Sequence, residues 1–133
     1  MLSVIALGLA LHADPETPSR QMFDLICSDR QEVTARRPKP LDDLRFRIDL
    51  TTNRFCVGGC SDMRTLTVYD DTLVLGQMDT IMAGSRVILR QSVDRHTGAY
   101  DMTSISEGQI VRQEKGQCLL APYTGPIRGE RLF

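Results

Sequence analysis

The sequence contains very little histidine: His12 and His96 are the only two in 133 residues. Because His12 falls in the expected export signal described below, a zinc site with several histidine ligands is excluded, and a nucleophile–histidine pair would have to use His96. His96 lies in the turn-like stretch RHTG, where nothing is expected to hold its tautomer or to exclude water. We therefore expect that the protein is not an enzyme and has no catalytic residue.

An excess of charge of one sign is also missing. The chain has 16 Lys and Arg residues against 17 Asp and Glu residues, and its sequence pI is near 6.1. Without a net positive field, binding to nucleic acid or to an anionic membrane surface is not expected. The densest basic patch, formed by Arg36, Arg37 and Lys39, lacks the interleaved aromatic residues of single-stranded nucleic-acid sites.

Motifs for phosphate and metal binding are absent from the sequence. The pair Gly58-Gly59 has neither the spacing nor the following Lys-Ser/Thr of a phosphate-binding loop. The candidate calcium ligands do not follow the Asp-x-Asp-x-Asp-Gly pattern; they are Asp62, Asp70, Asp71 and Asp79. Adjacent carboxylates in a strand point to opposite faces, so a hairpin turn explains Asp70-Asp71 more simply. No metal and no cofactor are expected.

Long apolar runs are limited to the first 13 residues, MLSVIALGLALHA. This run is shorter than the roughly 20 apolar residues that a membrane-spanning helix needs, and it has the length of the hydrophobic region of a signal peptide. The polar stretch DPETPSR follows at once. We therefore expect a signal peptide over residues 1–13 with cleavage after Ala13, a periplasmic or secreted protein, and no stable membrane insertion.

Four cysteines are present, Cys27, Cys56, Cys60 and Cys118. An even number in a small exported chain indicates two disulfides, for which three connectivities are possible. A five-residue turn around two glycines can bring its ends within disulfide range, which favours a bond between Cys56 and Cys60. The remaining pair, Cys27 and Cys118, would then form a long bridge.

Two other interpretations of the cysteines are less consistent with their spacing. A thioredoxin-like redox site has two residues between its cysteines at the start of a helix, whereas RFCVGGC has three and strand-like flanks. An all-cysteine zinc site normally pairs two closely spaced motifs, and this chain has one. The spacing therefore favours two disulfides over a redox site or a zinc site.

Helical periodicity is missing after residue 20, although residues 77–83 could form one helical turn. Residues 44–50, LRFRIDL, alternate strictly, with Leu44, Phe46, Ile48 and Leu50 on one face, and this predicts a half-buried strand. Similar alternation predicts strands around residues 23–27, 66–68, 73–75, 87–93, 100–102, 110 onward and 118–120. Turn residues separate these segments.

The spacing of the strands predicts an all-β fold: a small antiparallel meander of about seven or eight strands that closes into a barrel or folds as a sandwich. Because Cys27 lies on the first expected strand and Cys118 on the last, their bridge would join the two ends of the sheet and favours closure. Residues 14–120 are expected to form a single β domain, and residues 121–133 a loosely held C-terminal extension.

Binding through loops is the function that remains after these exclusions. The expected partner-binding residues are Arg95, His96, Thr97 and Tyr100 on one hairpin, with Arg36 and Arg37 on the long loop after the first strand. The partner would be another protein, and the chain itself a monomer. The alternative, a carrier of a small apolar ligand, would need a cavity, whereas about eight strands leave an interior that side chains fill.

The segments VDRHTGAYD (93–101), KGQC (115–118) and APYTG (121–125) resemble a pattern of small exported β-proteins of alphaproteobacteria. In these proteins a hairpin of the type (I/V)(D/N)R-x-TG-x-(Y/L) precedes a C-terminal G-x-C segment. The resemblance covers most of the chain after the signal, and it implies export and fold without implying an activity.

A second resemblance is to periplasmic inhibitors of C-type lysozyme, which are small β-barrels whose SGxxY hairpin enters the lysozyme cleft. The nearest match is TGAY at residues 97–100. Thr97 stands in place of the serine, Tyr100 comes one residue early, and the expected downstream lysine has only Lys115 as a candidate. The resemblance implies that Thr97 would enter the cleft.

Overall fold

The computed structural model describes residues 21–60 and 62–125, and this part of the chain is all β. Ten strands are assigned within the described residues, and three of them contain only two residues. The strands are β1 (Met22–Glu32), β2 (Lys39–Pro40), β3 (Leu44–Asp49), β4 (Arg54–Val57), β5 (Arg64–Thr65), β6 (Thr67–Val68), β7 (Thr72–Met82), β8 (Ser85–Asp94), β9 (Ala99–Ser106) and β10 (Gln109–Ala121). No helix in the described part is long and apolar enough to cross a membrane. The seven longer strands match the number expected from the sequence.

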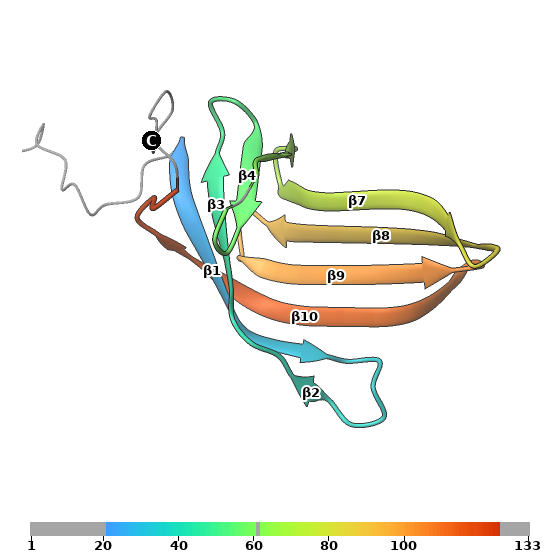
Figure 1. Ribbon diagram of the computed structural model, residues 1–133. Helices are drawn as coiled ribbons and strands as arrows, with labels where there is room; N and C mark the ends of the chain where they lie inside the picture. The colour runs from blue at the N-terminus through green and yellow to red at the C-terminus, as the bar shows by residue number, and fades with distance from the viewer. Residues whose placement is uncertain (1–20, 61, 126–133) are drawn as a thin grey trace, which may run out of the picture.

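The strands form one antiparallel sheet that nearly closes into a barrel (Figure 1). Its order is β5-β4-β3-β1-β10-β9-β8-β7-β6, with β2 paired to β1. The first and last long strands, β1 and β10, lie side by side in the middle of this order. The two strands at the ends of the order, β5 and β6, are separated in the chain by Leu66 alone, so the sheet curls until its two edges come close to each other. The predicted all-β antiparallel fold is confirmed, and of the two expected forms, barrel and sandwich, the sheet adopts a nearly closed barrel.

Both predicted disulfides are present, and the described residues contain no free cysteine. Cys27 of β1 lies directly opposite Cys118 of β10 in the strand register, and the two are bonded with their Cα atoms 3.9 Å apart. Cys56 and Cys60 are bonded across the turn after β4, with Cα atoms 5.0 Å apart. The long bridge therefore joins the first strand to the last, as expected, and such bonds persist in oxidising compartments.

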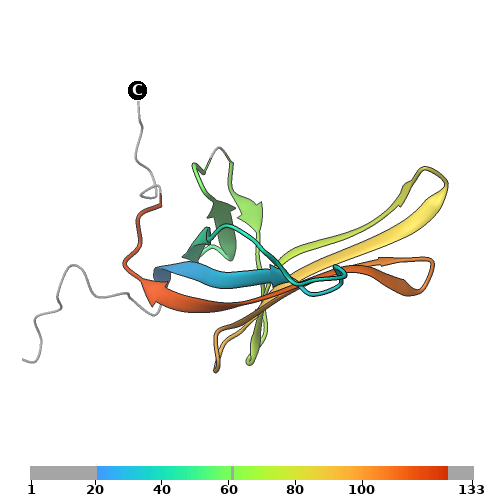
Figure 2. The same cartoon turned by 90° about the horizontal axis from the view of Figure 1, so that it is seen from below.

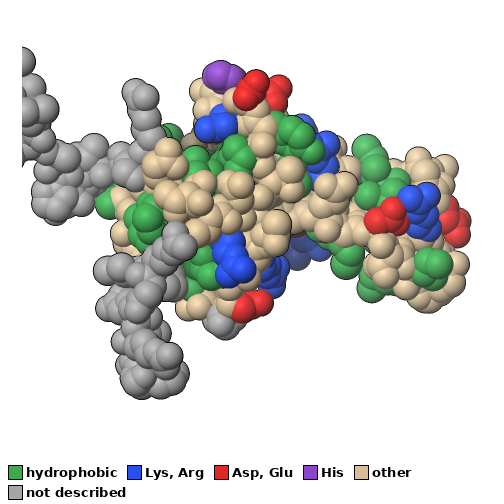
Figure 3. All heavy atoms as spheres, turned by 90° about the horizontal axis from the view of Figure 1, so that it is seen from above, with side chains coloured by type: hydrophobic (Ala, Val, Ile, Leu, Met, Phe, Trp, Pro, Cys, Tyr) green, Lys and Arg blue, Asp and Glu red, His purple; other side chains and the backbone are tan. Residues whose placement is uncertain are grey.

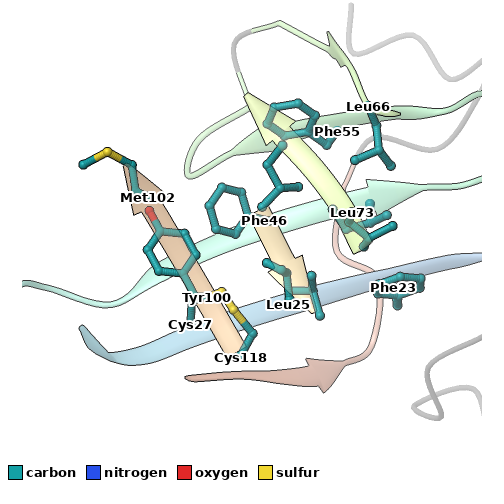
Figure 4. Close-up of a cluster of buried hydrophobic side chains, with 13 residues drawn as sticks. Phe23, Leu25, Cys27, Phe46, Phe55, Leu66, Leu73, Tyr100, Met102 and Cys118 are labelled. Carbon is teal, nitrogen blue, oxygen red and sulfur yellow. A yellow bond between two sulfur atoms is a disulfide. The ribbon is translucent and has the colours of Figure 1, made fainter. Parts of the chain in front are cut away.

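The barrel interior is filled by one cluster of buried side chains (Figure 4). Phe46 and Ile48 of β3 are fully buried, which confirms the alternation read from LRFRIDL. The ring of Phe46 lies between those of Phe55 and Tyr100, with centroid separations of 6.3 and 6.2 Å. Asp49 follows Ile48, so the alternation places it on the opposite face, which a half-buried strand turns to solvent. It is instead buried, and its carboxylate accepts hydrogen bonds from the Thr51 backbone N–H and hydroxyl.

The long strands β7 to β10 continue beyond this core as a projecting four-stranded ribbon (Figures 1 and 2). We call residues 77–90 and 103–112 the arm. Its end consists of two tight turns, Ala83-Gly84 and Glu107-Gly108, in which all four residues have positive φ. Turns of this kind match the twist of paired strands and favour hairpins. The expectation of a helical turn at residues 77–83 is wrong, because β7 pairs with β8 up to the Met82–Ser85 pair.

The start of the C-terminal extension is bound to the barrel. Ala121 still belongs to β10, where it pairs with Asp24 of β1. The Thr124 N–H donates to Asp24 Oδ1 at 3.2 Å, and the Thr124 carbonyl accepts from Arg47 Nη1 at 3.1 Å. Residues 121–125 are therefore not loosely held, contrary to the expectation. The expected signal peptide (1–13) and the rest of the extension (126–133) lie outside the described residues.

Candidate binding site

The hairpin between β8 and β9 carries the main group of sequence-predicted contact residues. Arg95, His96 and Thr97, which we call the hairpin tip, are all exposed. Asp94 shapes the turn, because its Oδ1 accepts hydrogen bonds from the N–H groups of His96 (2.8 Å) and Thr97 (2.9 Å). Its carbonyl also accepts from the N–H of Gly98 at 2.9 Å. This is a local side-chain-to-backbone turn of the kind that Asp favours.

The turn between β6 and β7 holds the hairpin tip on one side, and β10 holds it on the other. The N–H and Nη1 of Arg95 donate to the carbonyls of Asp71 and Tyr69, each at 2.8 Å. On the other side Gln117 Nε2 donates to the Thr97 carbonyl, and the Cys118 N–H donates to the Gly98 carbonyl at 2.8 Å. The tip is thus fixed before any partner arrives, which reduces the conformational entropy lost on binding.

A pocket of about 530 Å³ opens beside the hairpin tip. Its inner wall is formed by buried aliphatic and aromatic side chains, among them Phe23, Leu73 and Val93. Its remaining lining includes all three hairpin-tip residues and two exposed leucines of β10, Leu119 and Leu120. The volume falls within the range of small-molecule sites, and an apolar wall with a few polar groups at the mouth is their usual composition.

The hydrogen bonds that the Asp94 carboxylate accepts in this turn also change its pKa. The two N–H groups that donate to its carboxylate, from Thr97 first and then His96, lower the pKa of Asp94 below its usual value of 3.8. A carboxyl whose pKa is lowered in the folded state stabilises that state above the unfolded pKa, and this contribution is lost as the pH falls through the folded pKa.

We therefore expect the turn at the hairpin tip to keep its structure down to about pH 4 and to loosen only at lower pH, since protonated Asp94 is a weaker acceptor. The measurement is the amide chemical shifts of His96 and Thr97 followed by NMR during an acid titration. Asp94→Asn is the matched control, because it keeps an acceptor oxygen and does not titrate. A midpoint at or above the usual value for aspartate in the native protein would contradict the expectation.

Tyr100 does not belong to the accessible part of the site. It is 2% exposed, its hydroxyl accepts a hydrogen bond from Gln91 Nε2 at 2.8 Å, and burial raises its pKa. The guanidinium carbon of Arg30 lies 5.5 Å from the centre of its ring. The prediction that Tyr100 contacts a partner is corrected on this ground: two residues after Gly98 the strand alternation directs its side chain into the core.

Sequence reasoning missed the charged cluster beside Tyr100. Arg30 Nη2 pairs with Glu114 Oε1 at 2.5 Å, and both side chains are almost completely buried. Glu114 also accepts from Arg112. In the sequence Arg30 looks like the start of the basic loop. In the structure β1 continues through Arg30 to Glu32, with a bulge between Ser28 and Gln31. Its partner lies 84 residues away, so no local signal could have revealed the pair.

Arg36 and Arg37 lie apart from the pocket. They occupy the turn between β1 and β2, where both are exposed, and neither is among the residues that line the pocket. In the described residues no three His, Cys, Asp or Glu side chains are grouped so that they could hold a metal ion. The structure therefore brings the hairpin tip and the pocket together and leaves the basic loop separate.

No protein-family model, no curated protein and no solved structure matches the chain. A function for this protein is therefore inferred from the geometry of the site, because a barrel fold by itself does not define one.

Proposed function

We propose that this protein is an exported binding module that acts in the periplasm or as a secreted protein, and that it is not an enzyme. Its partner would be another protein, bound by the hairpin tip (Arg95, His96, Thr97) together with the neighbouring pocket. The observation that carries the proposal is the junction of a rigid, exposed turn with an apolar pocket of about 530 Å³.

The two parts of the site suit different parts of a protein surface. An apolar side chain of the partner would enter the pocket and gain the burial energy that makes such anchors dominate binding. The exposed hairpin tip would contribute polar contacts around this anchor. Arg95 uses one guanidinium nitrogen to donate to the Tyr69 carbonyl, so its remaining N–H groups can donate to a carbonyl or carboxylate of the partner.

The test is affinity capture from a periplasmic extract, with the folded, oxidised protein as bait. We expect one stoichiometric partner, and we expect the combined substitution of Arg95, His96 and Thr97 by alanine to weaken its binding at least ~10-fold, since a single important interface residue typically accounts for about 1 kcal/mol or more. Arg36→Ala with Arg37→Ala is the matched control, because these exposed arginines lie outside the pocket and their loss should leave binding unchanged. Capture that depends on the control pair and not on the hairpin tip would contradict the proposal.

The resemblance to inhibitors of C-type lysozyme names one partner to include in the same experiment. Thr97 is exposed at the hairpin tip, although its hydroxyl oxygen already accepts from the Ala99 N–H at 3.2 Å. Inhibition of a C-type lysozyme by the native protein, abolished by the hairpin-tip variant, would identify the partner class.

A carrier of a small apolar ligand is the second candidate, and the pocket is the observation that favours it. The barrel interior itself is filled by the core cluster, so the ligand would have to occupy the pocket lined by Phe23, Leu73 and Val93. Native mass spectrometry of the protein released from the periplasm distinguishes the candidates. A retained small molecule of constant mass would favour the carrier function over the protein-binding function.

A further inference from the structure

One edge of the arm has no neighbouring strand in the described structure. β6 pairs with β7 only at Leu73 and Val74, whereas β7 pairs with β8 from Thr72 to Met82. Over residues 76–82, β7 is therefore bonded on one side only, and in Figure 1 it forms the uppermost strand of the ribbon. Its second side presents backbone N–H and C=O groups that another strand could pair with.

This edge lacks the features that usually prevent strands from associating. Residues 76–82, GQMDTIM, contain no lysine and no proline, and three apolar side chains are exposed: Met78 by 41%, Ile81 by 72% and Met82 by 55%. The single charge, Asp79, is paired with Arg86 of β8, with Nη2 and Oδ2 2.6 Å apart. Figure 3 shows hydrophobic patches on this projecting end, interrupted by a few charged side chains. A long, apolar, unprotected edge indicates a surface that is covered by another strand.

We propose that a second copy of this chain covers the edge, with β7 of each copy paired antiparallel about a two-fold axis at Thr80. The protein would then be a dimer and not the monomer expected from the sequence, and the two arms would form one continuous eight-stranded sheet. A two-fold contact of this kind is closed, so it uses each edge once and does not grow into a filament.

The hairpin geometry of β7 determines which residues can pair. Met82 and Ser85 flank the two-residue turn Ala83-Gly84, and such flanking residues exchange both backbone hydrogen bonds. Since the direction alternates along a strand, the backbone groups of Met82 and Thr80 face β8. Those of Ile81, Asp79 and Gln77 face the open edge. Pairing with a second β7 must therefore use these three residues.

Charge, strand length and the position of β6 select one register among the possibilities. Opposition of Gln77 to the partner's Asp79 would bring the partner's Met82 beside Val74, which already pairs with β6. Opposition of Asp79 to the partner's Asp79 would place like charges directly across from each other, which is unfavourable. Opposition of Ile81 to the partner's Ile81 would pair fewer residues, because the turn begins at Ala83. The register with Asp79 opposite the partner's Ile81 avoids all of these problems, and it brings Thr80 opposite the partner's Thr80.

The chosen register also matches side chains across the two copies. Met78 falls opposite the partner's Met82, on the face of the arm that continues into the core through Leu89, so the apolar surface becomes continuous. On the other face Asp79 keeps its ion pair with Arg86 of its own chain, and the partner's Ile81 lies opposite Asp79, so no like charges face each other across the contact. This match of apolar side chains without a charge clash is the reason to assign the edge to a second copy.

The test is a site-specific crosslink in the oxidised, full-length protein. In the proposed register Thr80 and the partner's Thr80 form a pair without backbone hydrogen bonds, with Cα atoms about 4.5 Å apart, which is within disulfide range. We expect Thr80→Cys to form a disulfide-linked dimer at least ~5-fold more completely than Ile81→Cys. Ile81 is the more exposed of the two residues, but in this register it lies opposite the partner's Asp79, so a cysteine at position 81 has no cysteine across from it. Peptide mapping of the Cys27–Cys118 and Cys56–Cys60 bonds shows that each variant has folded.

Light scattering of the native protein at about 100 μM supplies the second measurement. We expect a mass twice that of the chain, and a single-chain mass for Ile81→Lys, since a charge on an edge strand prevents pairing. A native protein of single-chain mass at this concentration overturns the proposal. So does preferential crosslinking of Ile81→Cys, or an edge occupied by a strand of a different protein. Neither measurement involves the hairpin tip or the pocket, so the proposed function can fail independently.

Discussion

Replacement of Cys27 and Cys118 by alanine is expected to lower the free energy of unfolding by about 4 to 5 kcal/mol, more than any other substitution proposed for this protein. The bond closes a loop with a sequence separation of 91 residues, and in the chain-entropy model a longer loop restricts the unfolded chain more. Because single domains are stable by only about 5 to 15 kcal/mol, the variant should be near its unfolding limit. Urea unfolding followed by circular dichroism measures the loss.

The Cys56–Cys60 bond provides the matched control. Its sequence separation is 4, so the same model assigns it about 2 kcal/mol. Alanine is used in both pairs because Cys27 and Cys56 are fully buried and a serine hydroxyl there would lack a partner. Equal losses for the two pairs, or a larger loss for the short one, would show that the long bridge does not dominate stability.

Gly98→Ala is expected to destabilise the protein by about 3 kcal/mol and to disturb the hairpin tip. Gly98 has φ +77°, a conformation that costs other residues about 1 to 2 kcal/mol. A Cβ there would also overlap the Cys118 carbonyl oxygen and lie 2.8 Å from Gln117 Nε2. The strands would have to separate, which weakens the bond from the Cys118 N–H to the Gly98 carbonyl. The measurements are the unfolding free energy and the affinity for the captured partner.

Gly108→Ala separates the cost of the positive φ from the cost of the overlap between the added Cβ and a neighbouring strand. Gly108 has nearly the same φ, +78°, but an added Cβ would meet nothing within 4 Å. It should therefore cost only the backbone term of about 1 to 2 kcal/mol, and it should leave binding unchanged because it lies at the end of the arm. If Gly98→Ala costs no more than Gly108→Ala, the close approach of Gly98 to β10 is not important for stability.

The alternation of the strands was readable because burial on one face imposes a period of two residues. In the segment LRFRIDL this period correctly identified Phe46 and Ile48 as core residues. It was less reliable for a polar residue whose burial is made tolerable by local hydrogen bonds. Asp49 has the period of a solvent-facing residue, yet it is buried, and its carboxylate accepts hydrogen bonds from Thr51.

The candidate site was only partly predictable, for the same physical reason. The turn at residues 95–98 has a local cause, since Asp and Gly favour this geometry, and the sequence located it correctly. The pocket beside it has walls from β1, β7, β8 and β10, and no pattern within one segment can show that these strands meet. Tyr100 was misassigned because its closeness in sequence to the hairpin tip gave no information about the direction of its side chain.

The sequence by itself determined the all-β class, the cysteine pairing and the position of the turns, because each depends on residues that are close in the chain or on elimination among four cysteines. Only the tertiary structure decided that Arg30 meets Glu114, that a pocket opens beside the hairpin tip, and that within residues 21–60 and 62–125 no strand covers the apolar edge of β7. These features depend on which distant strands become neighbours. That choice is made by the curling of the whole sheet, in which the first and last long strands pair and are joined by the Cys27–Cys118 bond.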